Sequence, residues 1–380
     1  MILKALKYIR YEGEPREWRI TDKDEDINSF VDFGNINFFV GKNASGKSRS
    51  LTVIKEIGEF FAGKRDLQDA LFHAESFDAL FEDGEDVYEY LLTYKERRIV
   101  AESLRVNRHE ILNREKRIII DLDRNKQLPF PDDIASPFVY CLGQMNIPYF
   151  SNLALWGKLL RNYLFSNELE KRSFASDYRK LDMSPTDTNS TVYLGYTFYR
   201  GYEDFGEAYI SEIKDCMHLV GYENITNIEM RESKKGFGLY IEEDGRYTIS
   251  QMQMSQGLFR VLALFIRLVY YIMSKRSICI LIDDVGEGLD FERSKAMVNT
   301  MAKKINDSNI QLFMTTNDRY VMNQIPLRYW SVIERKESKS IFHNYFNSKE
   351  IFDDFKYTGL NNFDFLTTDF YKKGFDDSKD

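Results

Sequence analysis

A glycine-rich octapeptide at residues 41–48, GKNASGKS, constrains the fold of this chain more than any other stretch. It fits the pattern G-x-x-x-x-G-K-[ST] at every required position. Residues 36–40, just before it, form a short apolar run typical of a buried strand, and residues 49–61 carry apolar side chains at helical spacing. A strand, a glycine loop and a helix in this order predict an α/β core with a phosphate-binding turn.

The residue types in this loop suit a polyphosphate. Glycines allow the tight turn that brings backbone amides onto phosphate oxygens, and the following helix adds the positive end of its dipole. Lys47 would reach the β- and γ-phosphates, and the Ser48 hydroxyl would hold Mg²⁺. We therefore predict a nucleotide and Mg²⁺ site here, in which further contacts come from Gly41, Asn43, Ala44, Ser45, Gly46 and Arg49.

Length and composition bound the remaining possibilities. A chain of 380 residues predicts two or three domains, or one domain with sizeable insertions. The net charge of −8 argues against a broad nucleic-acid surface, although a local basic patch stays open. The three cysteines, Cys141, Cys216 and Cys279, are too far apart for a disulfide framework or a zinc site. Residues 1–10 lack the apolar core of a secretory signal, and we expect that no apolar run approaches the length needed to cross a bilayer, so we expect a cytoplasmic protein.

A second informative region begins at residues 254–257, MSQG, where Ser255 is placed to cap the apolar helix that follows. Residues 277–282 form an apolar strand that ends in Asp283 and Asp284, as parallel strands present acids at their carboxyl ends. The turn GEGLD at 286–290, a helix at about 291–305 and a strand at 310–316 ending at Asn317 follow. This alternation predicts a parallel sheet whose polar ends converge on one nucleotide.

The other segments are assigned more coarsely. Strand patterns at 2–18, 87–94, 98–104 and 117–122, with a hairpin turn at Asp83-Gly84, predict an antiparallel sheet beside the core. Residues 128–137 form a proline-bearing connector, 139–142 a short strand ending at Gln144, and 153–178 a helix. After strands at 329–333 and 341–346, an aromatic C-terminal segment is expected to pack back onto the domain rather than to dock a partner.

The glycine loop, the Ser-Gln-Gly helix start, the Ile-Leu-Ile-Asp-Asp strand, the Gly-Leu-Asp turn and the Thr-Thr-Asn-Asp strand end resemble the ABC-type ATPase superfamily. The resemblance is nearest to its soluble branch of SMC-, RecF- and OLD-like ATPases, the last of which occur in bacterial anti-phage systems. It implies an α/β P-loop NTPase fold, an ABC-ATPase head with a parallel core sheet, a side antiparallel β-sheet and a helical lobe. The implied divisions are an N-terminal ATPase lobe at 1–135, a helical lobe at 136–254, a C-terminal ATPase lobe at 255–335 and an aromatic segment at 336–380.

The resemblance also implies roles for particular residues. Asp283, Ser48 and the Q-loop glutamine Gln144 would hold the Mg²⁺ of ATP. Asp284 would orient the attacking water, with Glu287 as a substitute, and Asn317 stands where the family has its switch histidine. Ser255 and Gly257 of the signature motif, with Asp290 of the D-loop, would cap the ATP bound by a partner subunit.

The implied partners are a second copy of the chain, in a homodimer or higher homo-oligomer closed over ATP, and a separate effector. The chain after residue 333 is too short for a Toprim nuclease domain, so a nuclease or toxin would be another polypeptide. Asp284 and Asn317 depart from the family's Glu and His, and we therefore expect slow ATP hydrolysis that gates the effector, in bacterial anti-phage defence. Two alternatives stay open: a DNA repair or recombination ATPase of the RecF or SMC type, and a non-hydrolysing ATP sensor or scaffold.

Overall fold

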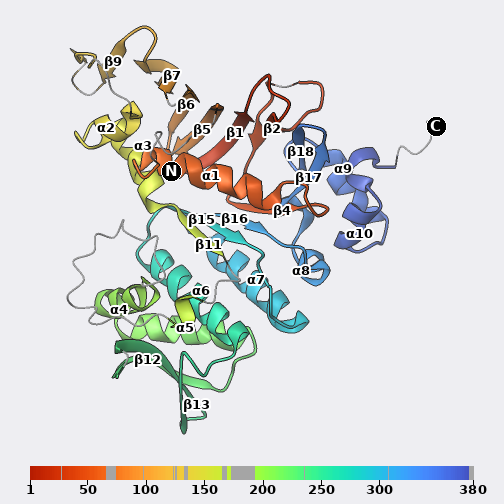
Figure 1. The fold of residues 1–380 in the computed structure, drawn as a ribbon. Helices are drawn as coiled ribbons and strands as arrows, with labels where there is room; N and C mark the ends of the chain where they lie inside the picture. Colours follow the sequence, from red (N-terminus) through yellow and green to blue (C-terminus); the bar gives the residue numbers. More distant parts are fainter. Residues whose placement is uncertain are drawn as a thin grey trace. The chain divides into compact units, whose positions relative to one another are not determined.

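The computed structural model describes residues 1–375 apart from residues 27, 66–73, 97, 123, 125, 132–135, 165–168, 173–192, 235 and 307. The chain forms two compact units (Figure 1). The first unit comprises Met1–Leu160, Ser277–Cys279 and Leu327–Asp380, and the second comprises Arg161–Arg276 and Ile280–Pro326.

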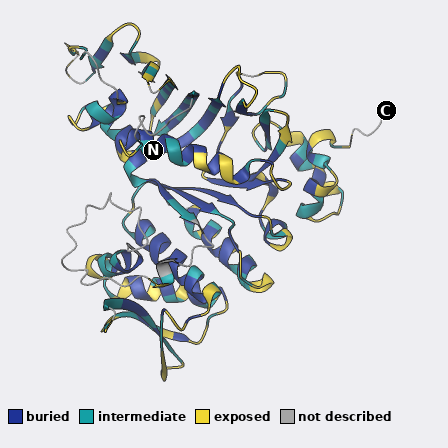
Figure 2. Ribbon diagram, in the orientation of Figure 1, coloured by how far each residue is buried: buried dark blue, intermediate teal, exposed yellow. Residues whose placement is uncertain are grey.

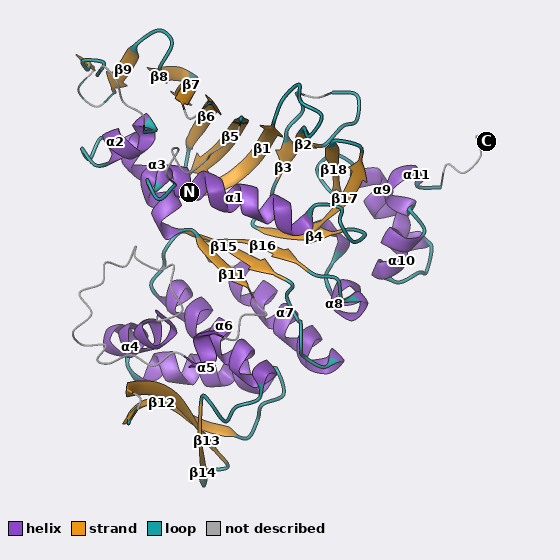
Figure 3. Ribbon diagram, viewed as in Figure 1, coloured by secondary structure: helices purple, strands orange, loops and turns teal. Residues whose placement is uncertain are grey.

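The first unit is built on a long mixed sheet (Figure 3) with the strand order β10-β9-β8-β7-β6-β5-β1-β2-β18-β17-β4, and β3 beside β1. Strands β1 and β5 to β10 pair antiparallel, whereas β18 runs parallel to β2 and β17 parallel to β4. The antiparallel sheet predicted beside the core is therefore confirmed. The strands are β1 (Ile2–Arg10), β2 (Trp18–Thr21), β3 (Val31–Asp32), β4 (Ile36–Val40), β5 (Glu75–Asp83), β6 (Asp86–Lys95), β7 (Arg98–Val106), β8 (His109–Asn113), β9 (Ile118–Asp121), β10 (Lys126–Gln127), β17 (Trp330–Lys336) and β18 (Lys339–Asn344).

Helix α1 (Lys47–Phe61) packs on this sheet through its aromatic end. The ring of Phe61 lies 4.9 Å from that of Tyr90 on β6 and 6.0 Å from that of Trp156 on α3 (Pro148–Leu159). The two helices cross closely, because a Cβ at Gly157 would lie 2.3 Å from the carbonyl oxygen of Gly58. These contacts anchor the helix that carries the glycine loop.

The predicted strand at 139–142 is wrong, because the segment forms α2 (Phe138–Gly143). Its first two amides, those of Phe138 and Val139, donate to the buried carboxylate of Glu102 on β7 at 2.7 and 3.4 Å. An anion at a helix N-terminus satisfies amides that have no partner inside the helix. This contact outweighs the strand preference of the local sequence.

The aromatic C-terminal segment packs within the first unit, as expected. It forms α9 (Lys349–Asp354), α10 (Asn362–Thr367) and α11 (Phe370–Lys373). Phe365 is fully buried, with its ring 4.6 Å from that of Phe352 and 6.4 Å from that of Trp330. Trp330 in turn lies 6.2 Å from Phe38, so the segment is joined to the strand that leads into the glycine loop.

The second unit contains a short stretch of sheet in the order β16-β15-β11, covered by helices. Strand β11 (Arg161–Leu164) runs parallel to β15 (Ile278–Asp283), whose first two residues belong to the first unit, and β16 (Ile310–Thr315) lies on its other side. The predicted helix at 153–178 is therefore wrong after Leu159, where buried Arg161 donates to the Tyr271 hydroxyl and the chain joins the sheet. Most of its remainder, residues 165–168 and 173–178, lies outside the described residues.

The helices of the second unit are α4 (Tyr193–Phe205), α5 (Glu207–Leu219), α6 (Gln256–Met273), α7 (Phe291–Asn306) and α8 (Arg319–Gln324). By length and composition α6 alone among the described helices could span a bilayer, which the sequence analysis had not anticipated. However, 78% of α6 is buried inside the protein (Figure 2), as for the core helix of a folded domain. Its Ile266 carbonyl accepts a hydrogen bond from the buried Tyr209 hydroxyl of α5 at 2.6 Å.

The second unit also contains a sheet that the sequence analysis did not predict. Strands β12 (Ile225–Ser233), β13 (Gly236–Glu243) and β14 (Tyr247–Ser250) pair antiparallel in that order. The turn between β13 and β14 places Asp244 and Gly245 at φ values of 54° and 64°. The α4 and α5 helices pack against this sheet and form the cavity described below.

Candidate functional site

The glycine loop connects β4 to α1 in the first unit, as the motif predicts. Ala44 and Gly46 adopt left-handed backbone angles, with φ of 62° and 107°. A Cβ at Gly41 would lie 2.5 Å from Ser45 Oγ, and one at Gly46 would lie 2.8 Å from Ser340 Oγ. The loop is thus folded so tightly that no side chain fits at either glycine.

The loop is held by β18 as well as by its own turn. The Ser340 hydroxyl donates to the carbonyl oxygen of Ser45 at 3.1 Å and accepts from the indole nitrogen of Trp18 at 3.0 Å. The guanidinium of Arg49 lies 3.9 Å above the Trp18 ring. A strand about 300 residues along the chain therefore fixes the shape of the loop, a contact absent from the motif itself.

Lys47 and Ser45 supply buried polar groups inside the loop. The Lys47 side chain is only 7% exposed, and its Nζ donates to the carbonyl oxygens of Gly41 at 2.9 Å and Lys42 at 3.2 Å. The buried Ser45 Oγ has no hydrogen-bond partner among the described residues. A buried hydroxyl without a partner is unfavourable, and an anion in the loop would satisfy it. The loop residues therefore fit a phosphate group, with Asn43 and Ser48 exposed at its surface.

Polar side chains meet at the carboxyl ends of β15 and β16 in the second unit. Thr315, fully buried, donates its hydroxyl to Asp283 Oδ1 at 2.5 Å and accepts the amide of Asp284 at 2.9 Å. Asp284 has a φ of 53°, and its Oδ1 accepts from the Asn317 side chain at 3.3 Å. The structure thus brings together the two acids and the asparagine that the sequence analysis selected. Thr315 was missed as a positioning group, and its signal was a hydroxyl at the end of the neighbouring strand.

The predicted signature and D-loop residues also lie together in the second unit. The Ser255 side chain caps α6 by accepting the amide of Leu258 at 3.2 Å. A Cβ at Gly257 would lie 2.8 Å from the side chain of Leu289 and 3.1 Å from the carbonyl oxygen of Gly288, so only glycine allows α6 to approach the 286–290 turn this closely. Arg260, which the sequence analysis did not select, donates to the Glu287 carbonyl at 2.7 Å and holds the same turn.

The remaining predicted residues have separate positions. Asp290 accepts the amide of Arg293 at 3.0 Å and pairs with its guanidinium, and these hydrogen bonds hold the Asp290 pKa below its ordinary value. Glu287 is exposed in the turn. Gln144 is exposed at the C-terminus of α2 in the first unit, at the end of a helix instead of the predicted strand.

Comparison with known proteins gives evidence from structure rather than from sequence. No protein-family model matches the chain, and no curated protein matches it in sequence. An SMC head bound to the C-winged helix domain of ScpA matches with a TM-score of 0.51 and 12% identity, over 90% of this chain and 97% of that chain. The SMC head domain from Thermotoga maritima matches with a TM-score of 0.46 and 13% identity, over 90% of this chain and 98% of that chain. A third structure is a Smc head domain with an extended coiled coil, bound to the C-terminal domain of ScpA derived from Pyrococcus furiosus. It matches with a TM-score of 0.48 and 10% identity, over 93% of this chain and 99% of that chain.

The first of these matches shows that the chain has the fold of SMC heads, the ABC-type P-loop ATPase fold. The predicted fold class, α/β with parallel strands, an antiparallel sheet and helices, is therefore confirmed. Identity this low speaks for the fold alone.

Proposed function

We propose that this protein is an ABC-type ATPase that binds ATP with Mg²⁺ through the loop at residues 41–48, dimerises on ATP and gates a partner effector. The loop itself carries the proposal. Its glycines exclude side chains, its Lys47 ammonium is buried against backbone carbonyls, and its Ser45 hydroxyl lacks a partner among the described residues. These groups suit the terminal phosphates of a nucleotide.

The polar cluster of the second unit supports a role with the metal of the nucleotide. Carboxylate and hydroxyl oxygens are the ligands that Mg²⁺ prefers, and we assign Asp283 and Ser48 as ligands, with Gln144 as the third candidate. Thr315 donates a hydrogen bond to one oxygen of Asp283 and so holds the carboxylate in one orientation. When bound, Mg²⁺-ATP supplies the phosphoanhydride bond that is hydrolysed.

Slow hydrolysis is part of the proposal. We assign Asp284 to orient the attacking water, and its carboxylate accepts a hydrogen bond from Asn317. An aspartate is one methylene shorter than a glutamate, and Asn317 cannot titrate as a histidine can. Glu287, exposed in the next turn, is the alternative residue for the same role. The short side chain of Asp284 and the non-titrating side chain of Asn317 both favour a switch that hydrolyses ATP slowly.

The start of α6 supports ATP-dependent pairing. Ser255 is exposed and lies at a helix N-terminus, where the helix dipole favours an anion. Gly257 sets this helix start against the 286–290 turn, which ends at Asp290, and we propose that Ser255, Gly257 and Asp290 act as one surface of the second unit. We assign this surface to the nucleotide held by a second copy of the chain, which gives a homodimer or a higher homo-oligomer.

The effector and the biological setting rest on sequence resemblance to OLD-like ATPases. Two of the similar SMC heads were solved bound to ScpA domains, which is a property of those proteins. For this chain we propose a separate effector, a nuclease or a toxin, in a cytoplasmic anti-phage defence module. The hydrogen bond between Asn317 and Asp284 also favours a second candidate, a non-hydrolysing ATP sensor or scaffold.

The test is ATP turnover by the wild-type protein and by Asp284→Asn, with molecular mass recorded by light scattering with and without ATP and Mg²⁺. Turnover in the wild type and an ATP-trapped dimer in Asp284→Asn would support the hydrolytic switch. A stable ATP dimer without turnover in either protein would favour the sensor. DNA binding that appears only with ATP and falls steeply with salt would instead favour an ATPase of the RecF or SMC type.

A further inference from the structure

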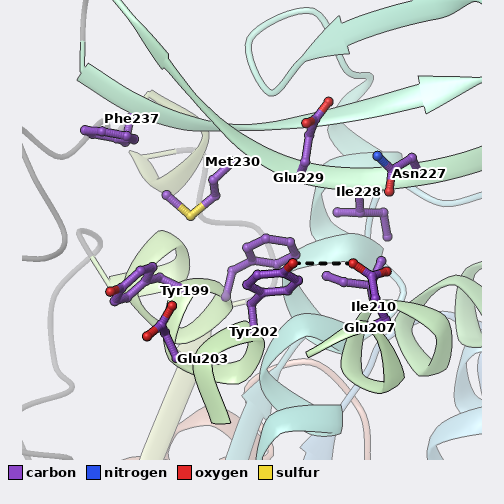
Figure 4. A pocket seen from close by; sticks show the side chains of 11 residues that line it. Tyr199, Tyr202, Glu203, Glu207, Ile210, Asn227, Ile228, Glu229, Met230 and Phe237 are labelled. Atoms are coloured by element: carbon purple, nitrogen blue, oxygen red, sulfur yellow. Dashed lines mark hydrogen bonds between the residues drawn. The ribbon is translucent and has the colours of Figure 1, made fainter. Parts of the chain in front are cut away.

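A cavity of about 400 Å³ lies in the second unit between the helices α4 and α5 and the strands β12 and β13 (Figure 4). Its volume falls in the range of small-molecule sites, about 300–1,000 Å³. None of its lining residues belongs to the glycine loop, the acidic strand end or the signature helix start. The cavity is therefore separate from every residue assigned above to the nucleotide.

The floor of the cavity is apolar and buried. Phe198, Ile210 and Ile228 line it and are 3%, 3% and 2% exposed. Figure 4 shows Met230 pointing from β12 toward the helices, with Tyr199 and Tyr202 on the helix side. Such a floor favours a ligand with an apolar body, because burial of apolar surface drives its binding.

Aromatic and acidic side chains surround this floor at helical spacing. Phe198, Tyr199, Tyr202 and Glu203 lie at i, i+1, i+4 and i+5 on α4, so two neighbouring rows of that helix face the cavity. Aromatic faces attract cations through the ring quadrupole, and the attraction grows when the cation is desolvated.

Every charged residue that lines the cavity is a glutamate: Glu203, Glu207 and Glu229. Glu229 is paired with Arg231, and in Figure 4 its carboxylate points away from the helices. Glu207 accepts a hydrogen bond from the Tyr202 hydroxyl at 3.4 Å, which orients it beside the aromatic face. Glu203 and Glu207 thus give the rim a negative potential that repels anions and attracts cations.

We propose that this cavity binds a small organic ammonium, a cationic amine carried on an apolar or aromatic body. The ammonium would lie at the face of Tyr202 beside the Glu207 carboxylate, and the apolar body would rest on the floor. Glu203 and Tyr199, on the other side of Tyr202, would add to the negative potential that attracts the cation. This site does not depend on the proposed ATPase activity, since it uses none of the same residues. It gives the second unit a ligand of its own.

The experiment is calorimetric titration of the full-length protein with phenethylammonium and with phenethyl alcohol, which has the same shape without the charge. We expect saturable binding of phenethylammonium and at least tenfold weaker binding of phenethyl alcohol. Equal binding of the two would overturn the proposal, because the site would then recognise only an apolar body. Tighter binding of Nα-acetyl-lysine amide than of phenethylammonium would also overturn it, since the occupant would then be a partner's lysine.

Substitutions test whether the carboxylates of Glu203 and Glu207 attract the ammonium. Glu203→Gln with Glu207→Gln should weaken phenethylammonium binding at least tenfold, and both side chains are exposed, so the change is mild for folding. The matched control Glu350→Gln removes an exposed charge on α9 of the first unit and should leave binding unchanged. Tyr202→Leu removes an aromatic face without changing the charge, and it should weaken the binding of phenethylammonium more than the binding of phenethyl alcohol. Unaltered binding in the double variant would contradict the site.

Discussion

Thr315 is the residue whose substitution tests the metal role that we propose for Asp283. Its hydroxyl makes a charge-assisted bond to Asp283 and accepts the Asp284 amide, in a fully buried position. Thr315→Val keeps the shape of the side chain and removes both hydrogen bonds. A bond to a charged group contributes about 1.5–3 kcal/mol and a neutral bond about 1 kcal/mol, so we expect a loss of about 2–4 kcal/mol in the free energy of unfolding.

The expected functional consequence of Thr315→Val is a lower affinity for Mg²⁺. Residues that orient a metal ligand typically change metal affinity by about 10- to 100-fold, and we expect the Mg²⁺ concentration that half-saturates ATP binding to rise by about that factor. The assay is ATP calorimetry over a series of Mg²⁺ concentrations, with stability measured by urea unfolding.

The neighbouring Thr316 provides a matched control. Its buried hydroxyl donates to the Val285 carbonyl at 3.0 Å and accepts the amide of Asp318 at 3.2 Å, and neither hydrogen bond involves Asp283 or Asp284. Thr316→Val should lower the free energy of unfolding by about 2 kcal/mol, for two neutral hydrogen bonds, and leave the Mg²⁺ dependence as in the wild type. The reasoning is refuted if Thr315→Val shows wild-type Mg²⁺ dependence, or if Thr316→Val shifts that dependence equally.

Three further predictions concern pairing, pH and packing. Ser255→Arg should bind ATP as the wild type does but fail to dimerise in light scattering; a variant that still dimerises with ATP rules out the signature assignment. Burial raises the pKa of Glu75, but the charges of Arg65 and Arg10 outweigh it and hold the pKa below its ordinary 4.5. The stabilising effect of ionised Glu75 is thus fully present above pH 4.5 and is lost as the pH falls through the lower folded-state pKa. In Glu75→Gln, the free energy of unfolding measured with urea should therefore fall less steeply as the pH is lowered through this range, and an unchanged slope would contradict this. Phe365→Ala should lower the unfolding free energy by about 3–5 kcal/mol, since the fully buried ring packs on Trp330; a change below about 1 kcal/mol would show that the C-terminal segment is not part of the core.

The local conformation of the glycine loop could be predicted because its residue types leave few choices. Gly41 and Gly46 stand where a Cβ would collide with Ser45 and Ser340, and the flanking strand and helix occur where the apolar patterns placed them. The same holds for β15, since a continuous apolar run that ends in acids suits a buried parallel strand. Local chemistry therefore predicts each of these elements, and the distant contact from Ser340 then holds the loop in place.

The errors arose where distant contacts decide the structure. The segment at 139–142 is helical because Glu102, more than 30 residues away, accepts the amides that begin the helix. The chain after Leu160 enters the sheet because β15, which follows more than 100 residues later, provides the partner strand. In contrast, the β13–β14 hairpin has a local signal, Asp244-Gly245, of the same kind as Asp83-Gly84. It was recoverable from sequence, and so was the hydroxyl of Thr315 at the end of β16.

The most direct test of the nucleotide site is calorimetric titration of ATP with Mg²⁺ into the wild-type protein and into Lys47→Ala. The Lys47 ammonium is the buried positive charge of the loop, and alanine is too short to replace it. Our account predicts saturable ATP binding by the wild type and no detectable binding by a folded Lys47→Ala protein. Equal affinity in the two proteins would contradict it, because the loop at residues 41–48 would then not be the site of ATP.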